Sequence, residues 1–496
     1  MSTAACDVAV VGAGIGGLTT AGLLVRAGRS VILLDRASRP GGACQDVVID
    51  GRRFEVGATL LSGFDPGGPL ARLCQRLDIT LPVNAADPVF QVALPDHRIS
   101  LWTQPDAWWR EIRREFPGEE AAWRALWSEL EEAAAAREEA VKGLPSLPPE
   151  GWKERLRLWS ALTFPVGSPV SAKTRATLKE VGSAPLRVSM TRHGLGERSQ
   201  RALEAMLWFL LLRGADECST LEAAVVLQRA RCGVVSISGG AAALAVAMAE
   251  KFQQDGGELR LGTAVDHFVY ENHRIAGVVM VGGETIRARV LVADVPSELL
   301  AGSLLPRRRW WRRRDALGGP WHPPHMLQAM VVAVPEAIVP SELSGHCFVV
   351  PAPRCLAREE NVVFVRSSPA RDDQLRGHAL RHVTVGRFVK AQRSAEAAAV
   401  EEELLEVLDE VVPGVGTAVA FRRLLEPTDL EAAWGRPSGP VWRSADAHDW
   451  LGQRGLPHRL GWPGLLAVGE WTYPGRLIAD VVEGAMRVAD LITQGS

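Results

Sequence analysis

The sequence predicts an α/β fold in which one parallel-sheet domain is assembled from three separated chain segments. Residues 7–35 read as a strand, a glycine turn, a helix and a second strand. Residues 233–294 repeat this texture, and residues 456–496 contain an apolar strand, a turn and an amphipathic helix. The length of 496 residues, with 47% hydrophobic and 23% charged residues, provides for two or more globular units. The intervening stretches are expected to form a second, mainly helical domain.

The predicted domain boundaries follow these changes in pattern. The first domain takes residues 1–70, 231–296 and 456–496. The second domain takes the two insertions, residues 71–230 and 297–455. Long helical patterns dominate the first insertion, and a mixed pattern with many prolines fills the second.

Individual elements can be assigned from local patterns. Residues 46–61 predict a hairpin that turns at Asp50 and Gly51, a dipeptide that suits a two-residue hairpin turn. In the first insertion, residues 119–142 and 203–212 have the spacing of long helices.

The first strand of the βαβ unit is followed by Gly12-x-Gly14-x-x-Gly17, which opens the predicted helix. In a Rossmann-type dinucleotide site the first glycine permits a tight turn, the second lets the backbone approach a pyrophosphate, and the third lets helix and strand pack closely. Asp35 stands 23 residues after Gly12, at a strand end where a carboxylate accepts hydrogen bonds from ribose hydroxyls. The combination predicts dinucleotide binding, and Asp35 is compatible with FAD or NAD.

Further glycine motifs distinguish between these two dinucleotides. The chain reads RPGGAC at residues 39–44, FEVGAT at the end of the predicted hairpin, SGG before a helix at residues 238–240, and GEWTYPG near its end. With the opening motif, these features resemble the FAD-dependent superfamily of phytoene desaturases, carotenoid isomerases and amine oxidases. The segment VVIDGRRFEVGATLLSGF is most similar to the carotenoid isomerase and retinol saturase branch. The resemblance covers residues 8–64, 234–295 and 464–493, and it implies a Rossmann-type, GR2-like FAD-binding domain with a separate substrate domain.

The resemblance assigns FAD contacts to the positions that match the family's motifs. It places the ADP half at the opening glycine turn and the acidic strand end, and the path toward the flavin at the glycine doublet. It places the adenine side at a backbone contact in the middle segment, and the ribityl or phosphate region at the closing glycine–acid pair. The matching positions are Gly12, Ala13, Gly14, Ile15, Gly16, Gly17, Asp35, Arg36, Gly41, Gly42, Ala43, Val265, Gly469, Glu470, Leu477 and Ile478.

Two of these places depart from the family pattern. Ala43 stands where amine oxidases and bacterial desaturases usually carry arginine, although carotenoid isomerases also have a small residue there. In the closing segment, Glu470 replaces the commoner aspartate, and Arg476 and Leu477 stand where many desaturases keep small residues under the flavin.

The resemblance implies flavin-dependent redox or isomerisation chemistry on carbon–carbon bonds of a long isoprenoid lipid, of the carotenoid desaturase, isomerase or saturase type. An amine-oxidase-like flavoenzyme acting on a smaller amine is the first alternative, and a non-catalytic prenyl-binding escort protein on the same scaffold is the second. The glycines at 194–196 and 282–283 lack the context of a second dinucleotide site, so a quinone or oxygen is the expected electron acceptor. The histidines are isolated along the chain, and the sequence assigns no catalytic base.

The stretch from Arg307 to Arg314 reads RRRWWRRR, in a chain whose formal net charge is only −2. A membrane-surface contact and an ordinary solvated loop both fit this segment. Because the chain has no basic domain, nucleic acid is not an expected partner. The sequence shows neither a signal-peptide pattern nor a membrane-spanning run, so we expect a cytoplasmic protein, with peripheral contact to the inner face of the membrane as an open addition.

Two apolar patterns in the first insertion have open interpretations. Trp123 and Trp127, spaced i and i+4, fit either a core-facing stripe or the wall of a lipid tunnel, and the MLWFLLL run at residues 206–212 shares this ambiguity. Residues 151–162 mix Trp and Leu with basic side chains, as an interfacial helix does. The HPPH sequence at residues 322–325 lacks further ligands nearby, so no metal site is expected.

Overall fold

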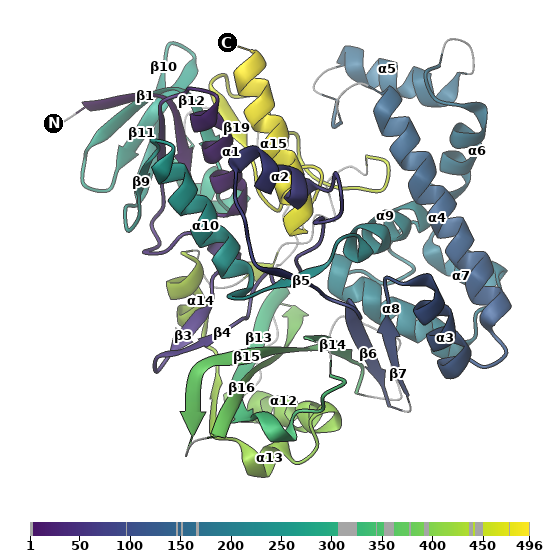
Figure 1. Cartoon of the computed structure of the whole chain (residues 1–496). Coiled ribbons are helices and arrows are strands. Elements are labelled where there is room, and N and C mark those ends of the chain that lie inside the picture. Colours follow the sequence, from purple (N-terminus) through teal and green to yellow (C-terminus); the bar gives the residue numbers. More distant parts are fainter. Residues whose placement is uncertain are drawn as a thin grey trace.

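The computed structural model shows two sheets and a helical unit (Figure 1). The seven-stranded sheet carries the glycine motifs, the eight-stranded sheet lies below it in this view, and the helices of the first insertion stand beside both. The α/β fold class is therefore confirmed. The structure describes residues 3–95, 97–144, 147–149, 152–164, 168–305, 325–343, 345–351, 362–375, 378–390, 396–435, 440–441, 450–475 and 477–495.

Seven strands from three distant chain segments form the first sheet. They are β1 (Thr3–Val11), β2 (Val31–Leu34), β9 (Glu258–Arg260), β10 (Val265–Glu271), β11 (Arg274–Met280), β12 (Thr285–Ala293) and β19 (Leu465–Ala467). Their order is β10–β11–β12–β1–β2–β9, with β19 beside β12. β12 pairs in parallel with β1 along most of its length and with β19 at its end, where Leu291 lies opposite Leu465. One sheet thus unites the three segments.

Helices from all three segments pack around this sheet. α1 (Ile15–Arg26) follows β1, α10 (Gly240–Gln254) follows the middle glycine turn, and α15 (Ile478–Gln494) lies near the end of the chain, while α2 (Pro69–Leu77) contacts α1 and α15. The apolar side chains of these helices share one core with the strands, in which Val8 and Val10 of β1 meet Leu18 of α1 and Val482 of α15. Burial of this surface holds the glycine turn between β1 and α1 in place.

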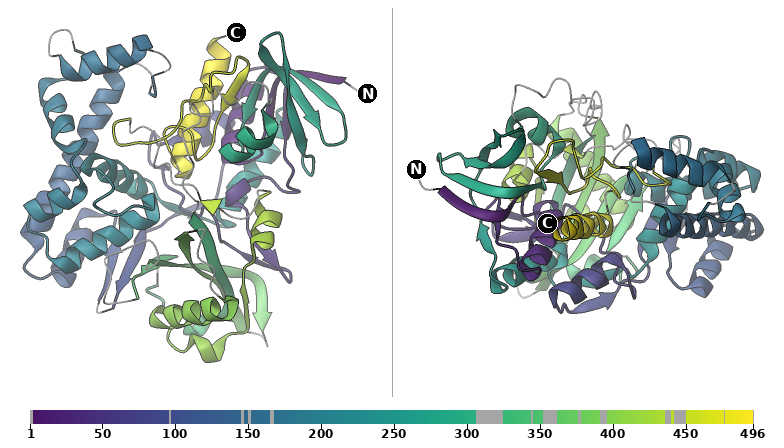
Figure 2. Two further views of the ribbon diagram at one scale, coloured as in Figure 1. Left: turned by 180° about the vertical axis from the view of Figure 1, so that it is seen from behind. Right: turned by 90° about the horizontal axis from the view of Figure 1, so that it is seen from above.

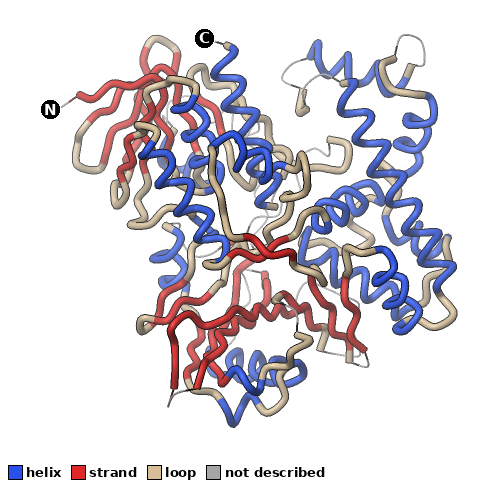
Figure 3. The backbone as a smooth tube through the Cα atoms, viewed as in Figure 1, coloured by secondary structure: helices blue, strands red, loops and turns tan. Residues whose placement is uncertain are grey.

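The first insertion forms the helical unit on the right of Figure 1, which is also the main group of blue helices in Figure 3. Its helices are α3 (Pro105–Glu115), α4 (Glu120–Gly143), α5 (Trp152–Thr163), α6 (Ala172–Val181), α7 (Leu186–Arg192), α8 (Glu197–Leu211) and α9 (Thr220–Arg231). Trp123 and Trp127 on α4 are buried against Trp108, and the indole N–H of Trp123 donates to Ser199 Oγ at 2.7 Å. Trp123 therefore faces the core, whereas Trp127, although buried, also lines a cavity between α4 and α9, so the core-facing interpretation is confirmed for Trp123 alone.

The second sheet is shared by both insertions. Its strands are β6 (Phe90–Leu94), β7 (His97–Leu101), β13 (His325–Pro335), β14 (His346–Val349), β15 (Val363–Leu375), β16 (His378–Lys390), β17 (Phe421–Leu424) and β18 (Pro440–Val441). They lie in the order β17–β13–β16–β15–β14–β6–β7, with β18 beside β13. The apolar side chains of α12 (Ala397–Val411) and of α13 (Val415–Ala418) pack on this sheet.

The helices of the second domain are concentrated in the first insertion, whereas the second insertion contributes mainly strands. Valine-rich runs such as HVTVGRFV at residues 382–389 favour strands, because β-branched side chains pack well on a pleated surface. Val383 and Val385 of β16 face the core beneath α12, while His382 and Thr384 face the hairpin of the first segment. The boundaries assigned to the two domains stay a prediction.

The predicted hairpin around Asp50 and Gly51 is confirmed. It consists of β3 (Val47–Ile49) and β4 (Arg52–Phe54), and both turn residues have positive φ, at 48° and 78°. The second sheet fastens the hairpin, because Arg366 Nε donates to Glu55 Oε2 at 3.0 Å and the His382 ring donates from Nδ1 to the Arg53 carbonyl at 2.7 Å. A further short pair joins β5 (Val83–Ala85) to β8 (Val235–Ile237).

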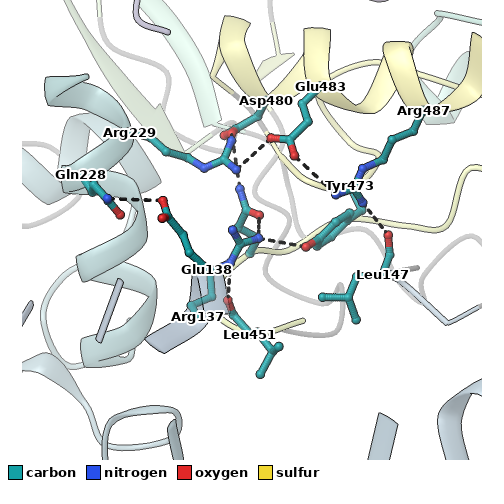
Figure 4. A network of polar contacts seen from close by, with 11 residues as sticks. Arg137, Glu138, Leu147, Gln228, Arg229, Leu451, Tyr473, Asp480, Glu483 and Arg487 are labelled. Atoms are coloured by element: carbon teal, nitrogen blue, oxygen red, sulfur yellow. Dashed lines mark hydrogen bonds and ion pairs between the residues drawn. The ribbon is translucent and has the colours of Figure 1, made fainter. Parts of the chain in front are cut away.

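A buried polar network joins the helical unit to α15 (Figure 4). Arg229 of α9 contacts Asp480 and donates to Glu483 at 2.9 Å, and Gln453 donates to the same Asp480 at 3.3 Å. Burial alone would lower the pKa of Arg229, but the two carboxylates raise it, so the guanidinium stays charged. From α4, Arg137 donates to Tyr473 Oη at 3.0 Å. The network therefore couples two helices of the unit to the helix that starts beside the glycine motifs.

We predict that Arg229→Ala lowers the free energy of unfolding by about 3–5 kcal/mol, because it leaves Asp480 and Glu483 largely buried without their cation. The control is Arg76→Ala, which removes a side chain that is 42% exposed and pairs at 2.8 Å with Asp490, itself 47% exposed. Such surface pairs contribute about 1 kcal/mol or less. Urea unfolding followed by circular dichroism measures both variants, and an equal shift of the two midpoints would contradict the importance of the network.

Candidate functional site

The turn between β1 and α1 brings backbone atoms into unusually close contact. Gly12 has φ of +104°, and a Cβ built on it would lie 2.0 Å from the carbonyl oxygen of Asp294. A Cβ on Gly17 would lie 1.9 Å from the Gly12 carbonyl oxygen. Only glycine fits at either position, which is the tight-turn and close-packing requirement that the motif predicts. The turn leaves the N-terminus of α1 facing a cavity, and the first turn of this helix carries no acidic residue.

Asp35 lies at the end of β2 with its carboxylate directed at this turn. Its two oxygens accept hydrogen bonds from the N–H groups of Ala13, at 2.6 Å, and Ala37, at 2.8 Å. Burial raises the pKa of Asp35, and these donors together with the Arg36 charge oppose the rise. A carboxylate oxygen accepts more than one hydrogen bond, so each oxygen retains capacity for a hydroxyl donor from a ligand.

The glycine doublet lies directly against the first glycine turn. The Gly41 N–H donates to the Ala13 carbonyl at 2.7 Å, and a Cβ on Gly42 would come 3.4 Å from Gly14 Cα. Ala43 follows, and its carbonyl accepts from the N–H of Ala58, just beyond the hairpin, at 2.9 Å. The doublet therefore connects the opening turn to the hairpin along one wall of the cavity.

Asp294 is the central residue that sequence reasoning missed. Its carboxylate Oδ2 accepts from the Gly17 N–H at 2.7 Å, and its own N–H donates to the Val11 carbonyl at 2.8 Å. A Cβ on Gly14 would lie 2.6 Å from Asp294 Oδ2, and one on Gly469 would lie 2.7 Å from Oδ1. Its position in the sequence offers a signal, because Asp294 directly follows an apolar strand, as Asp35 does.

The closing segment completes the same site. After β19, Gly469 and Glu470 lead into Trp471, whose indole N–H donates to the Val295 carbonyl at 2.8 Å. Buried Cys44 lies on the same cavity, and burial, with the charges of Asp294 and Glu470 as smaller causes, raises the pKa of its thiol to about 12. The chain then turns into α15, whose first residue, Ile478, lines the cavity.

One cavity gathers these elements, with about 1230 Å³ of atom-free space that is partly open to solvent. Thirteen of the sixteen predicted residues line it, and Ala13, Gly17 and Leu477 lie beside lining residues in the chain. Residues that were not predicted also line it: Val11, Leu34, Cys44, Ala58, Thr263, Ala264, Asp294, Val295, Pro296, Leu299, Leu304, Trp434, Gly435, Trp471 and Val481. Trp434 and Gly435 end α14 (Pro427–Trp434), so the second insertion contributes to the cavity as well.

The lining fits a dinucleotide. A helix N-terminus and glycine backbone at one point suit a pyrophosphate, and the Asp35 carboxylate at the end of β2 suits a ribose. The apolar side chains of Trp434, Ile478 and Val481 provide surface for an aromatic ring system. The arrangement can therefore hold an extended molecule that carries an anionic centre and a flat apolar end.

A second cavity is lined by the residue that directly precedes α15. Leu477 lines it, immediately before Ile478 of the first cavity. One wall of this cavity is apolar and comes from Leu210 and Leu211 at the end of α8 and from Val225 and Val226 of α9. The other lining residues are mostly charged or polar, with turn residues among them: Arg213, Glu222, Arg229, Gly452, Gln453, Arg454, Pro474, Gly475 and Asp480. Both interpretations of the MLWFLLL run, a core stripe and a cavity wall, therefore apply. Met206, Leu207 and Trp208 are buried in the core, while Leu210 and Leu211 line the second cavity.

Several predicted features fall outside the described residues. They include the RRRWWRRR stretch at residues 307–314, Arg476, and the first three residues of the HPPH sequence. In the part of the chain that the structure describes, no helix is long and apolar enough to cross a membrane. Within those same ranges, His, Cys, Asp and Glu side chains form no group of three or more that can hold a metal ion.

The chain matches known proteins along almost all of its length. A model of the family described as flavin containing amine oxidoreductase matches residues 15–493. A neurosporene-forming phytoene desaturase of Cereibacter sphaeroides is 24% identical over 517 aligned residues, which cover 97% of this chain and 93% of that protein. A chloroplastic prolycopene isomerase of an Oncidium hybrid cultivar is 22% identical, over 97% of this chain and 82% of its own.

Solved structures share the fold. An oxidoreductase from Methanosarcina mazei aligns with a TM-score of 0.62 and 17% sequence identity, covering 98% of this chain and all of that one. The overall fold of this chain is therefore one that this solved protein shares.

We predict that Gly12→Ala abolishes flavin retention, because the new Cβ would meet the Asp294 carbonyl oxygen inside the turn. Gly28→Ala is the matched control: Gly28 also has positive φ, at +79°, but a Cβ there meets nothing within 4 Å. Both variants incur the strain of a positive φ, roughly 1–2 kcal/mol, so the larger part of any difference between them reports the close contact. The ratio of visible flavin absorbance to protein absorbance measures retention, and equal retention in both variants would contradict the prediction.

Proposed function

This chain belongs to the flavin-containing amine oxidoreductase family and is an FAD-dependent oxidoreductase, and on that premise we propose that it acts on carbon–carbon bonds of a long isoprenoid lipid. The reaction would be of the carotenoid desaturase, isomerase or saturase type. Two relatives with 97% coverage of this chain are named for such chemistry, a phytoene desaturase and a prolycopene isomerase. The single observation that carries the proposal is the apolar wall of the second cavity, because its lining residue Leu477 directly precedes Ile478, which lines the cofactor cavity.

In the proposed complex, each predicted residue has a physical role toward FAD. The Asp35 carboxylate would accept hydrogen bonds from the adenosine ribose, and the backbone at Gly12 and Gly14 would lie against the pyrophosphate. The Val265 backbone would contact the adenine side, while Gly41 and Gly42 would let the chain pass close to the path toward the flavin. The closing pair, Gly469 and Glu470, and the residues Leu477 and Ile478 would lie along the ribityl and flavin end.

The chemistry divides between the cofactor and the chain. When bound, FAD supplies a two-electron acceptor for hydride from an allylic carbon, or in reduced form assists rotation about a double bond. The chain's part is to hold the hydrocarbon beside that centre and to exclude water. The side chains of Leu210, Leu211, Val225 and Val226 suit both tasks, because an apolar wall favours hydrocarbon over water. A quinone or oxygen is the electron acceptor that we propose for the desaturase case.

We predict that detergent-dispersed phytoene bleaches the visible flavin band of the holoenzyme under anaerobic conditions. Leu211→Asn should slow this bleaching about tenfold or more, because an amide placed against hydrocarbon costs roughly 1–3 kcal/mol, while flavin retention stays unchanged. The control Val188→Asn makes a similar apolar-to-polar change on α7, at a side chain that is 52% exposed and does not line either cavity. Equal bleaching rates for the two variants would contradict the proposed position of the substrate.

The same spectrum separates the alternatives. If phytoene leaves the band intact but the pre-reduced enzyme interconverts geometric isomers of a carotene, the isomerase type is correct. Bleaching by small amines and by no lipid would replace the proposal with an amine oxidase. A purified chain that retains no flavin after incubation with FAD would favour the non-catalytic escort protein.

A further inference from the structure

Helix α5 turns a row of large apolar side chains toward solvent. Trp152, Leu156 and Trp159 are 72%, 53% and 54% exposed, and Phe164, one residue beyond the helix end, is 50% exposed. Single exposed apolar residues are ordinary, but two tryptophans, a leucine and a phenylalanine on one short element form a patch that marks an interaction surface. From this patch and its charges we propose that α5 docks the protein onto an anionic phospholipid surface.

The spacing shows that the exposed row is one face of the helix. Trp152, Leu156 and Trp159 stand at i, i+4 and i+7, and these positions lie within a narrow stripe of a 3.6-residue helix. The opposite face is already used, because Leu158 and Ala161 are buried and Leu158 belongs to a small core with Leu147 and Tyr473. The exposed stripe is therefore a second apolar face, additional to the one that attaches α5 to the protein.

Basic side chains flank this stripe on both sides. At 100° per residue, Arg155 lies on one edge of it and Lys153 on the other, while Arg157 lies farther round toward the attached face, and all three are exposed. Glu154 points toward the attached side and is less exposed. An apolar stripe containing tryptophan between cationic edges has the form of a helix that lies in the plane of a membrane, with rings at the headgroup level and cations near anionic lipid phosphates. The chain as a whole is near neutral, so this complementarity is local to α5.

The position of α5 connects the proposed surface to the site. Figures 1 and 2 show α5 at one end of the helical unit, at the far end of α4 from α3 and α7. Through Leu158 it packs beside Tyr473, and the next two residues, Pro474 and Gly475, line the second cavity. A protein docked through α5 would thus have this cavity close to the bilayer from which a lipid substrate must come. This last step rests on the proposed function, whereas the docking itself does not.

The test is co-sedimentation of the holoenzyme with vesicles made of equal parts phosphatidylglycerol and phosphatidylcholine. We expect the double variant Trp152→Ser/Trp159→Ser and the double variant Lys153→Glu/Arg155→Glu each to lower the partition coefficient about tenfold or more, since both apolar burial and cationic charge contribute. Wild-type binding should also weaken in high salt and on vesicles of phosphatidylcholine alone.

Two matched controls isolate α5 from general effects. Val188→Ser/Val281→Ser removes two apolar side chains that are 52% and 69% exposed elsewhere, and Arg72→Glu/Arg110→Glu makes the same charge change on α2 and α3. Both controls should bind vesicles like the wild type. Unchanged binding by the α5 variants, or an equal loss in the controls, would overturn the proposal. Sedimentation velocity without lipid tests whether a second copy of the chain covers the stripe instead. A wild-type dimer that the tryptophan variant converts to a monomer would identify the stripe as a subunit interface.

The outcome is separable from that of the proposed function. If docking depends on α5 and the variants still bleach with detergent-dispersed phytoene, both proposals stand. If docking depends on α5 but no lipid bleaches the flavin, the docking surface stands and the isoprenoid substrate is wrong.

Discussion

The structure depends on one close approach, the contact between the end of β12 and the glycine turn that follows β1. The Asp294 carbonyl oxygen would lie 2.0 Å from a Cβ at Gly12, and the Asp294 carboxylate accepts the Gly17 N–H at 2.7 Å. No side chain can stand between these segments, so the turn, the start of α1 and the end of β12 form one unit. Because β12 also pairs with β19, the backbone at Gly469, just after β19, lies against the other carboxylate oxygen of Asp294. Three chain segments thus converge on one acidic side chain, and the cavity forms around that point.

Two further sets of contacts position the rest of the molecule around this point. The hairpin that carries Glu55 reaches from the cavity to the second sheet, where Arg366 holds it. On another side, the buried ions at Arg229, Asp480 and Glu483 fix the helical unit against α15. Buried ion pairs contribute little net stability compared with apolar packing, but removing one partner is costly, so they specify one arrangement more than they stabilise it. Here that arrangement sets the second cavity beside the first residues of α15.

How much of this was predictable from sequence depends on whether the signal was local. The glycine turn, the Asp35 strand end and the Asp50–Gly51 hairpin are encoded within short stretches, because turns and strand ends require particular residue types. The remaining predicted positions came from the family resemblance, and together thirteen of the sixteen predicted residues line the cavity. Asp294 contacts a turn that lies 277 residues away, and nothing local to it announces that partner. Trp434 and Gly435 reach the cavity from the second insertion for the same reason. The second sheet was not anticipated because β6, which pairs with its neighbour β7, also pairs with β14 across about half the chain, and a run of valines does not specify its partner.

The exposed face of α5 shows a second limit of prediction from sequence. The sequence gives the periodicity of the helix, but it does not show which of its faces packs against the protein. Residues 151–162 were compatible with an interfacial helix, and α5 has one apolar face on the protein and a second facing outward. An outward stripe of two tryptophans and a leucine would be an aggregation hazard in a protein that never leaves water, because exposed apolar area favours self-association. The flanking cations reduce that hazard by mutual repulsion between copies and become favourable at an anionic surface. A chain that must meet a lipid while remaining dispersed benefits from this pairing of an apolar stripe with flanking charge. On the attached side of α5, Leu158 shares a core with Tyr473, and the next two residues, Pro474 and Gly475, line the cavity whose apolar wall would hold such a lipid.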